Sequence, residues 1–231
     1  MASIQDNVRG VRERVAAAAR RAGRSPDDVT IVAITKTFPA GTVEAVLRAG
    51  ITDVGENRVQ ELVAKADAVA LPCRWHLVGP LQRNKAAKVV GRVALIHAID
   101  GVRIAETVDR LSGERGVRTA VLLEVNTSGE ASKHGVVPAE AAAAAEALAA
   151  LAHVDFRGLM TIGPLDGGPV EVRACFRQLA ALAVELRRVT GRPLPDLSMG
   201  MSGDFEIAIE EGATLIRPGR VITGERPVST G

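Results

Sequence analysis

One stretch of the chain reads Val29-Thr30-Ile31-Val32-Ala33-Ile34-Thr35-Lys36. Residues 29–34 are uncharged and mostly β-branched, which is typical of a strand buried on both faces. Similar short apolar runs recur along the chain. We interpret them as further strands, at about 53–56, 75–79, 93–98, 119–125, 156–161, 196–201 and 214–217. Together with the first run they make eight candidate strands.

Helical stretches alternate with these strands. The first is amphipathic and spans about 3–23, because apolar residues recur at helical spacing behind a capping Ser3 and stop at Gly23. The others lie at about 40–49, 58–69, 84–90, 101–112, 138–152, 170–190 and 203–211. Repeated strand–helix units with apolar strands predict a parallel sheet.

The number of units predicts the fold. Eight strand–helix units indicate an α/β protein, a single (β/α)8 barrel of the TIM type with an extra N-terminal helix. An open, doubly wound sheet is the alternative, because it requires no set number of strands. No stretch rich in Gly, Ser or Pro is long enough to link two domains. We therefore expect one domain over residues 1–231, with the helix at about 3–23 and the barrel at about 29–226.

The composition narrows the functional classes. Hydrophobic residues make up 47% of the chain but aromatic residues only 2%, with no Tyr, so the core must consist mainly of Val, Leu, Ile and Ala. A formal net charge of +2 without a dense Lys/Arg run argues against nucleic-acid binding. No apolar run is long enough to span a membrane, and the N-terminus lacks an apolar signal region. Cys73 and Cys175 cannot make a disulfide framework, so we expect a cytoplasmic protein.

Functional residues of such a barrel lie where its strands end. Lys36 directly follows the first strand. A partly desolvated ammonium has a lowered pKa, and the neutral amine attacks carbonyl carbons, so Lys36 is the candidate nucleophile. The alternative is a strand-end lysine that extends to water or pairs with Glu56. The other lysines fall in helical or loop segments that we expect to be solvated: Lys65, Lys85, Lys88 and Lys133.

The loops after the seventh and eighth strands, residues 198–204 and 217–220, are a second candidate region. These loops are the usual phosphate position of the fold, where backbone N–H groups receive the anion. Ser202 could instead be only a helix cap, and Gly219 only a turn residue. His76 lies in the third strand, where a single histidine is more often a satisfied core residue than a catalyst. The four histidines of the chain lack the spacing of metal ligands, so no metal site is expected.

Five segments taken together resemble one known family. They are Ala33–Lys36, Gly55–Glu61, Trp75–Lys85, Gly158–Thr161 and Leu197–Ser202. In this order, and over nearly the whole chain, they are similar to the pyridoxal phosphate homeostasis protein family. The second and third segments are the most specific.

The resemblance implies a fold similar to the N-terminal barrel of alanine racemase and pyridoxal 5′-phosphate held as a Schiff base on Lys36. It implies that Arg217 faces the pyridine nitrogen and that residues 202, 219 and 220 hold the phosphate. The whole set of cofactor-binding residues is Lys36, Asn57, His76, Met199, Ser202, Arg217, Gly219 and Arg220. Family members often carry Ser or Thr where this chain has Arg220, whose backbone N–H can still serve phosphate.

The resemblance also implies a role in holding, buffering and delivering the cofactor. We expect a monomer, with apoenzymes that use pyridoxal phosphate as partners. The alternative is an amino-acid racemase or another low-activity enzyme that uses the same cofactor. A racemase similar to the alanine enzyme needs a Tyr opposite the lysine, and this chain has no Tyr. Weak activity through Lys36, alone or with His76, remains open. An interaction module with a vestigial site is a third possibility.

Overall fold

The computed structural model describes residues 3–224 and forms a closed barrel of eight parallel strands in chain order. The strands are β1 (Thr30–Ile34), β2 (Asp53–Glu56), β3 (Arg74–Leu77), β4 (Leu95–Ile99), β5 (Thr119–Glu124), β6 (Val154–Met160), β7 (Asp196–Ser198) and β8 (Leu215–Ile216). Pairing of β8 with β1 closes the sheet. The predicted barrel is confirmed and the open sheet is excluded. The barrel end predicted at residue 226 lies outside the described residues.

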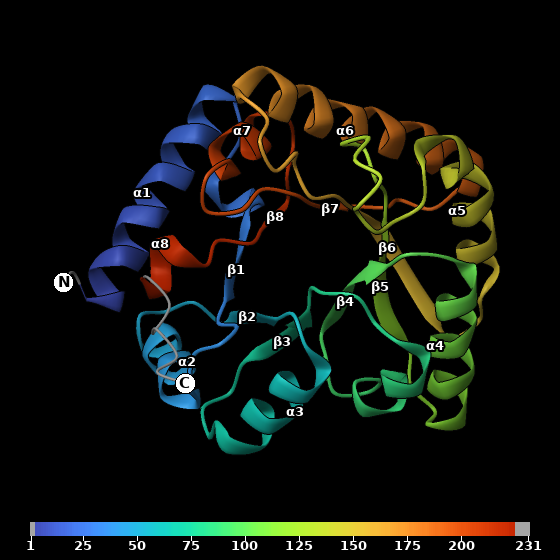
Figure 1. Ribbon diagram of the computed structural model, residues 1–231, viewed down its shortest axis with the longest axis horizontal. Helices are drawn as coiled ribbons and strands as arrows, with labels where there is room; N and C mark the ends of the chain where they lie inside the picture. Colours follow the sequence, from blue (N-terminus) through green and yellow to red (C-terminus); the bar gives the residue numbers. More distant parts are fainter. Residues whose placement is uncertain (1–2, 225–231) are drawn as a thin grey trace.

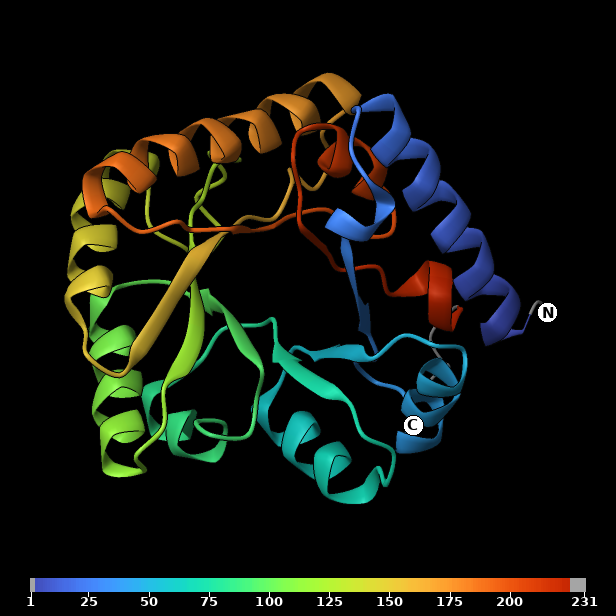
Figure 2. The same ribbon diagram turned by 180° about the vertical axis from the view of Figure 1, so that it is seen from behind.

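Helices surround the strands as an outer ring in both views (Figures 1 and 2). The α-helices are α1 (Ile4–Arg21), α2 (Ala40–Arg48), α3 (Val59–Ala68), α4 (Val102–Glu114), α5 (Ala141–Ala150), α6 (Pro169–Thr190), α7 (Phe205–Glu210) and α8 (Arg220–Thr223). Short 3₁₀-helices are η1 (Pro26–Asp28), η2 (Arg83–Lys88) and η3 (Pro138–Glu140). Among residues 3–224, no helix combines the length and the apolar character needed to cross a membrane.

The predicted N-terminal helix is α1, and it completes the ring. Ser3 caps it by accepting a hydrogen bond from the Asp6 amide. The helices after β7 and β8 are short, with six and four residues. The 18-residue α1 packs against both of them and against α2. It therefore covers the part of the barrel wall that these two short helices do not (Figure 1).

Most predicted boundaries differ from the structure by a few residues, and two of the differences have a clear structural form. The helix expected at 84–90 is the 3₁₀-helix η2. The strand expected at 196–201 ends at Ser198, because the chain turns at Gly200 with φ +89°. A Cβ at Gly200 would lie 2.8 Å from the Phe205 α-carbon, so only glycine fits this approach of the loop to α7.

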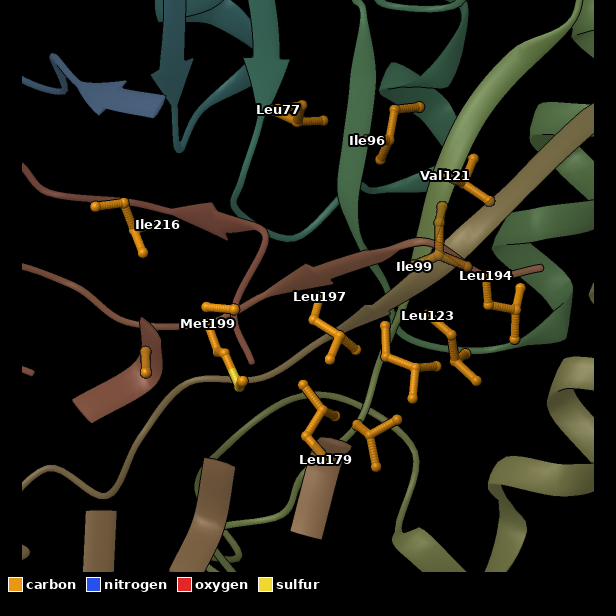
Figure 3. Packing of buried hydrophobic residues seen from close by; sticks show 14 of the residues in the cluster. Leu77, Ile96, Ile99, Val121, Leu123, Leu179, Leu194, Leu197, Met199 and Ile216 are labelled. Carbon is orange, nitrogen blue, oxygen red and sulfur yellow. The ribbon is translucent and has the colours of Figure 1, made fainter. Parts of the chain in front are cut away.

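Side chains of the strands alternate between two apolar regions. On β5, Val121 and Leu123 pack outward, whereas Leu122 packs inward. The outward residues and the helices form one large cluster, which we call the outer shell (Figure 3). The inward residues form a small cluster, the interior cluster: Val32, Ile34, Val78, Leu95, Ala98, Leu122, Met160 and Leu215.

Candidate functional site

The segments after β1 and β8 lie side by side at the carboxyl end of the barrel. The Ile34 amide donates to the Pro218 carbonyl at 2.9 Å. A Cβ at Gly219 would lie 3.4 Å from the Ile34 carbonyl oxygen, so the loop after β8 passes close to the end of β1. Lys36, two residues further on, therefore shares one edge of the barrel with the loop that carries Arg217.

The backbone on both sides of Lys36 is held by hydrogen bonds from outside the strand. Thr37 has φ +70°, a conformation that typically costs a β-branched residue about 1–3 kcal/mol. Its amide donates to Glu61 Oε2 at 2.9 Å. On the other side, Lys65 Nζ donates to the Thr35 carbonyl at 2.8 Å. Helix α3, which carries both Glu61 and Lys65, thus fixes the turn that presents Lys36.

Lys65 is buried, and the expectation that it is solvated is wrong. Its Nζ lies 2.6 Å from Glu56 Oε1, which also accepts from the Thr35 hydroxyl at 2.7 Å. Burial raises the pKa of Glu56 above its ordinary value, although the bonds from Lys65 and Thr35 oppose the rise. Spacing could have revealed this lysine. It follows Leu62 by three residues and Val59 by six, and all three lie on the buried face of α3.

Arg217 is buried where β8 ends, and two groups hold its guanidinium. Nη1 donates to Ser198 Oγ at 2.6 Å, and Nη2 donates to the Thr161 carbonyl at 2.8 Å. Burial lowers the pKa of Arg217 to about 10, against the opposing effect of Asp204 and Glu124. The side chain therefore stays protonated at neutral pH. A fixed cation stands at this edge of the barrel.

Ser202 receives backbone donors from the loop after β8. Its Oγ accepts from the Gly219 amide at 3.0 Å and from the Val221 amide at 3.5 Å. The N-cap position of α7 belongs to Asp204, so Ser202 is not the cap of that helix. Arg220 is the first residue of α8, and its side chain is exposed. The Ser202 hydroxyl and the amides at the start of α8 thus lie together as one small polar group, in which two of the amides donate to the hydroxyl oxygen.

Asn57 and the loop after β3 also meet at the carboxyl end. A Cβ at Gly79 would lie 2.3 Å from the Asn57 carbonyl oxygen, so this close backbone contact requires glycine. Asn57 itself is half-buried. It lies after β2, the neighbour of the strand that leads to Lys36.

His76 reaches this group only through other side chains, and Met199 packs outside it. The His76 ring is inside the barrel, with Nε2 at 2.9 Å from Asp53 Oδ1 and Nδ1 at 2.9 Å from His97 Nε2. Both ring nitrogens are therefore engaged by the protein. Met199 is fully buried and packs in the outer shell, near Leu197 and Leu179 (Figure 3). Its side chain faces away from the barrel interior, so we leave Met199 out of the proposed site.

Glu124 is an important interior residue that the sequence interpretation missed. It ends β5, two residues after the inward-facing Leu122, and is 4% exposed. Among the described residues its Oε2 has no hydrogen-bond partner. Burial raises its pKa to about 7, although the charge of Arg217 opposes the rise. Alternation along β5 was the available signal, since an acidic residue at an inward position has to meet either a partner or a ligand.

The carboxyl end of the barrel therefore combines an amine, a fixed guanidinium, a hydroxyl and backbone amides. An amine at a strand end suits a ligand with an electrophilic carbon. Amides and a hydroxyl at a helix start suit a phosphate. The interior carboxyl of Glu124 adds a proton that is exchanged near neutral pH.

Comparisons with known proteins identify the family and the fold. Residues 3–227 match the family model described as alanine racemase, N-terminal domain. The chain is 41% identical over 217 residues to a pyridoxal phosphate homeostasis protein of Aquifex aeolicus, covering 94% of this chain and 95% of that protein. It is 40% identical over 230 residues to a protein of the same name from Pseudomonas aeruginosa, covering 98% and 97%.

A solved structure gives the same result. PipY of Synechococcus elongatus, with PLP bound, superposes on this chain with a TM-score of 0.82 and 37% sequence identity. The match covers 93% of this chain and 100% of PipY.

Proposed function

This chain belongs to the pyridoxal phosphate homeostasis protein family, and from that premise we propose that it binds pyridoxal 5′-phosphate and takes part in its homeostasis. In this role it stores the cofactor, buffers its reactive aldehyde and delivers it. The observation that carries the proposal is the likeness to PipY with PLP bound, at 37% identity over 93% of this chain.

The donor set at the carboxyl end supports this ligand. Pyridoxal 5′-phosphate supplies an aldehyde, an electron-withdrawing ring and a phosphate dianion. Lys36, on its strained and doubly tethered turn, is the residue proposed to hold the aldehyde covalently as a Schiff base. Ser202, Gly219 and Arg220 are the residues proposed to hold the phosphate, and the Ser202 hydroxyl already lies 3.0 Å from the Gly219 amide.

Arg217 bears on the choice between carrier and enzyme. We assign its guanidinium to the ring nitrogen. A fixed cation there disfavours protonation of that nitrogen and weakens the electron withdrawal that carbanion chemistry needs. The chain has no Tyr, and both nitrogens of His76 bond to protein groups, so neither residue type supplies a ready second base. These features support a carrier over a racemase.

The remaining assignments concern the context of the protein. We assign it to the cytoplasm, because the thiols of Cys73 and Cys175 are both free, which suits a reducing compartment. We assign residues 1–231 to one binding domain, supported by a family match over 3–227. We expect the protein to act as a monomer that delivers the cofactor to apoenzymes.

The absorption spectrum of the purified protein tests the proposal. We expect a band of covalently bound cofactor that is absent from Lys36→Ala and retained in Lys88→Ala, a matched loss of an exposed lysine. Borohydride reduction followed by peptide mass mapping should place the adduct on Lys36. An adduct confined to another lysine, or no adduct, would refute the assignment. Sustained racemisation of single L-amino acids at ordinary enzyme rates would refute the carrier role.

A further inference from the structure

Five polar side chains cross the inside of the barrel in one unbroken series of hydrogen bonds. His76 Nε2 lies 2.9 Å from Asp53 Oδ1, and His76 Nδ1 lies 2.9 Å from His97 Nε2. His97 Nδ1 lies 2.7 Å from Ser198 Oγ, which accepts from Arg217 Nη1 at 2.6 Å. We call these five residues the interior relay. All of them are buried, and Asp53 is the most exposed at 7%.

The two ends of the relay have fixed roles. Arg217 can only donate, because a guanidinium has no acceptor. Burial raises the pKa of Asp53, but hydrogen bonds from His76 and Thr52 outweigh it, so the pKa lies below its ordinary value. At neutral pH the carboxylate therefore only accepts. His76 must then carry a proton on Nε2.

The roles of the middle groups follow from the ends. Burial lowers the pKa of His97 well below its ordinary value, so its neutral ring has one donor and one acceptor. Ser198 accepts from Arg217 and has its own hydrogen to give to His97 Nδ1. With a neutral His76 ring, Nδ1 is the acceptor, and His97 donates to it from Nε2. In this arrangement every bond runs in the same direction, from Arg217 to Asp53.

We propose that Asp53, His76, His97 and Ser198 are positioning residues for Arg217, joined in a one-directional relay that anchors its guanidinium to the opposite end of the barrel. The assignment of a ligand to Arg217 rests on the proposed function, whereas the direction of the relay does not. Asp53 is the first residue of β2, at the amino end of the strands. The exposed Arg74 reaches it at 3.4 Å, so the relay extends to the face opposite the candidate site.

The relay couples distant groups because the proton position on each ring sets which atom of its neighbour donates and which accepts. Loss of the Asp53 acceptor leaves His76 Nε2–H buried without a partner, which is costly. Reversal of both rings removes that cost, since His76 and His97 would each donate from Nδ1. Ser198 would then accept from His97 and from Arg217 together. Loss of Asp53, at the amino end of the strands, thereby changes the hydrogen bonding of Ser198, which holds Arg217.

Ring nitrogen NMR on the protein without ligand tests the direction. With ¹⁵N-labelled histidine, His76 and His97 should both be protonated on Nε2 and not on Nδ1. In Asp53→Leu, His97 should instead carry its proton on Nδ1. A proton on His97 Nδ1 in the parent protein, or an unchanged His97 in the variant, overturns the relay. This measurement stands even if no cofactor binds.

Cofactor affinity tests the positioning role. Ser198→Ala and Asp53→Leu should each weaken binding by about tenfold, the usual worth of a hydrogen bond to a charged group. Their combination should be no weaker than either variant alone, because each breaks the same relay. Loss by about a hundredfold in the double variant, the product of two independent effects, would overturn the proposal.

A matched control separates positioning from general destabilisation. Ser112 is fully buried in the layer between α4 and β5, where its hydroxyl lies 2.7 Å from the Thr119 hydroxyl. Ser112→Ala removes the same group as Ser198→Ala from a buried hydrogen-bonded pair outside the relay. It should lower thermal stability and leave cofactor affinity unchanged. Equal losses of affinity in both serine variants would contradict a special role for Ser198.

Discussion

The outer shell and the barrel interior are built from alternate residues of the same strands, yet they differ in chemistry. The outer shell is almost wholly aliphatic, with Phe176 and Leu179 of α6 among its fully buried members. The interior has a small apolar cluster, the interior relay and the Glu124 carboxyl. Burying a polar group is costly unless it is hydrogen-bonded. The comparison shows that the buried polar groups of the interior come from β2, β3, β4, β5 and β7, whereas the outward faces mostly supply apolar packing.

Removing Phe176 tests the outer shell and should have the largest effect. Phe176→Ala deletes a fully buried ring and should lower the free energy of unfolding by about 4 kcal/mol. Urea unfolding measures this loss. Cofactor affinity, measured below the unfolding transition, should stay near that of the parent. A large loss of cofactor affinity would contradict the separation of roles between the outer shell and the barrel interior.

Lys65 is a buried charged residue on α3, close to the candidate site. Lys65→Met leaves Glu56 buried without its partner and should cost about 3–4 kcal/mol in urea unfolding. Unlike Phe176→Ala, it should also weaken cofactor binding, because the Thr35 carbonyl before Lys36 loses its donor. Adding Glu56→Leu should restore most of the stability, since an apolar pair replaces the charges. Binding should remain impaired in that double variant.

Glu124, in the barrel interior, should make the free energy of unfolding of the protein depend on pH. Its pKa is about 7 in the folded protein and near 4.5 when unfolded, so below pH 4.5 the carboxyl is protonated in both states. As the pH rises toward 7, only the unfolded state loses the proton, and stability falls. Between pH 4.5 and 7, the free energy of unfolding of the parent should fall by about 3 kcal/mol relative to that of Glu124→Gln. Unfolding curves of both proteins at several pH values measure the difference, with the exposed Glu106→Gln as control.

A surface ion pair provides the smallest expected effect. Arg48 and Glu44 on α2 pair at 2.7 Å, four residues apart, and the Arg48 side chain is 65% exposed. Arg48→Ala should cost about 0.3–0.5 kcal/mol, less in high salt. Thermal unfolding at two salt concentrations checks this. If Arg48→Ala cost as much stability as Lys65→Met, the buried Lys65–Glu56 pair and the exposed Arg48–Glu44 pair would contribute equally, and burial would not explain their difference.

The barrel could be predicted from sequence because short apolar strands alternate with helical periodicity over the whole chain. The interior could not be predicted in the same way. We treated the strands as uniformly apolar, whereas Asp53, His97 and Glu124 occupy inward positions. Strands of two to six residues, such as β8 and β5, show too few periods for alternation to be recognised. Lys36 was visible because it follows a strand, but Lys65 reaches the site from a helix and depends on tertiary packing.

The placement of α1 has a consequence for how the protein is made. Asn7 of α1 donates to the Ile222 carbonyl at 2.9 Å, a bond between residues 215 positions apart. Contacts of such separation form late, since the intervening chain must first be closed into a loop. During synthesis, the first helix therefore waits for the last strand and for the loop that contains Gly219. On the proposed assignment of the phosphate to the loop that contains Gly219, the phosphate site is completed only when this last part of the barrel has been made, and a nascent chain passes most of its synthesis with α1 unpartnered on that side.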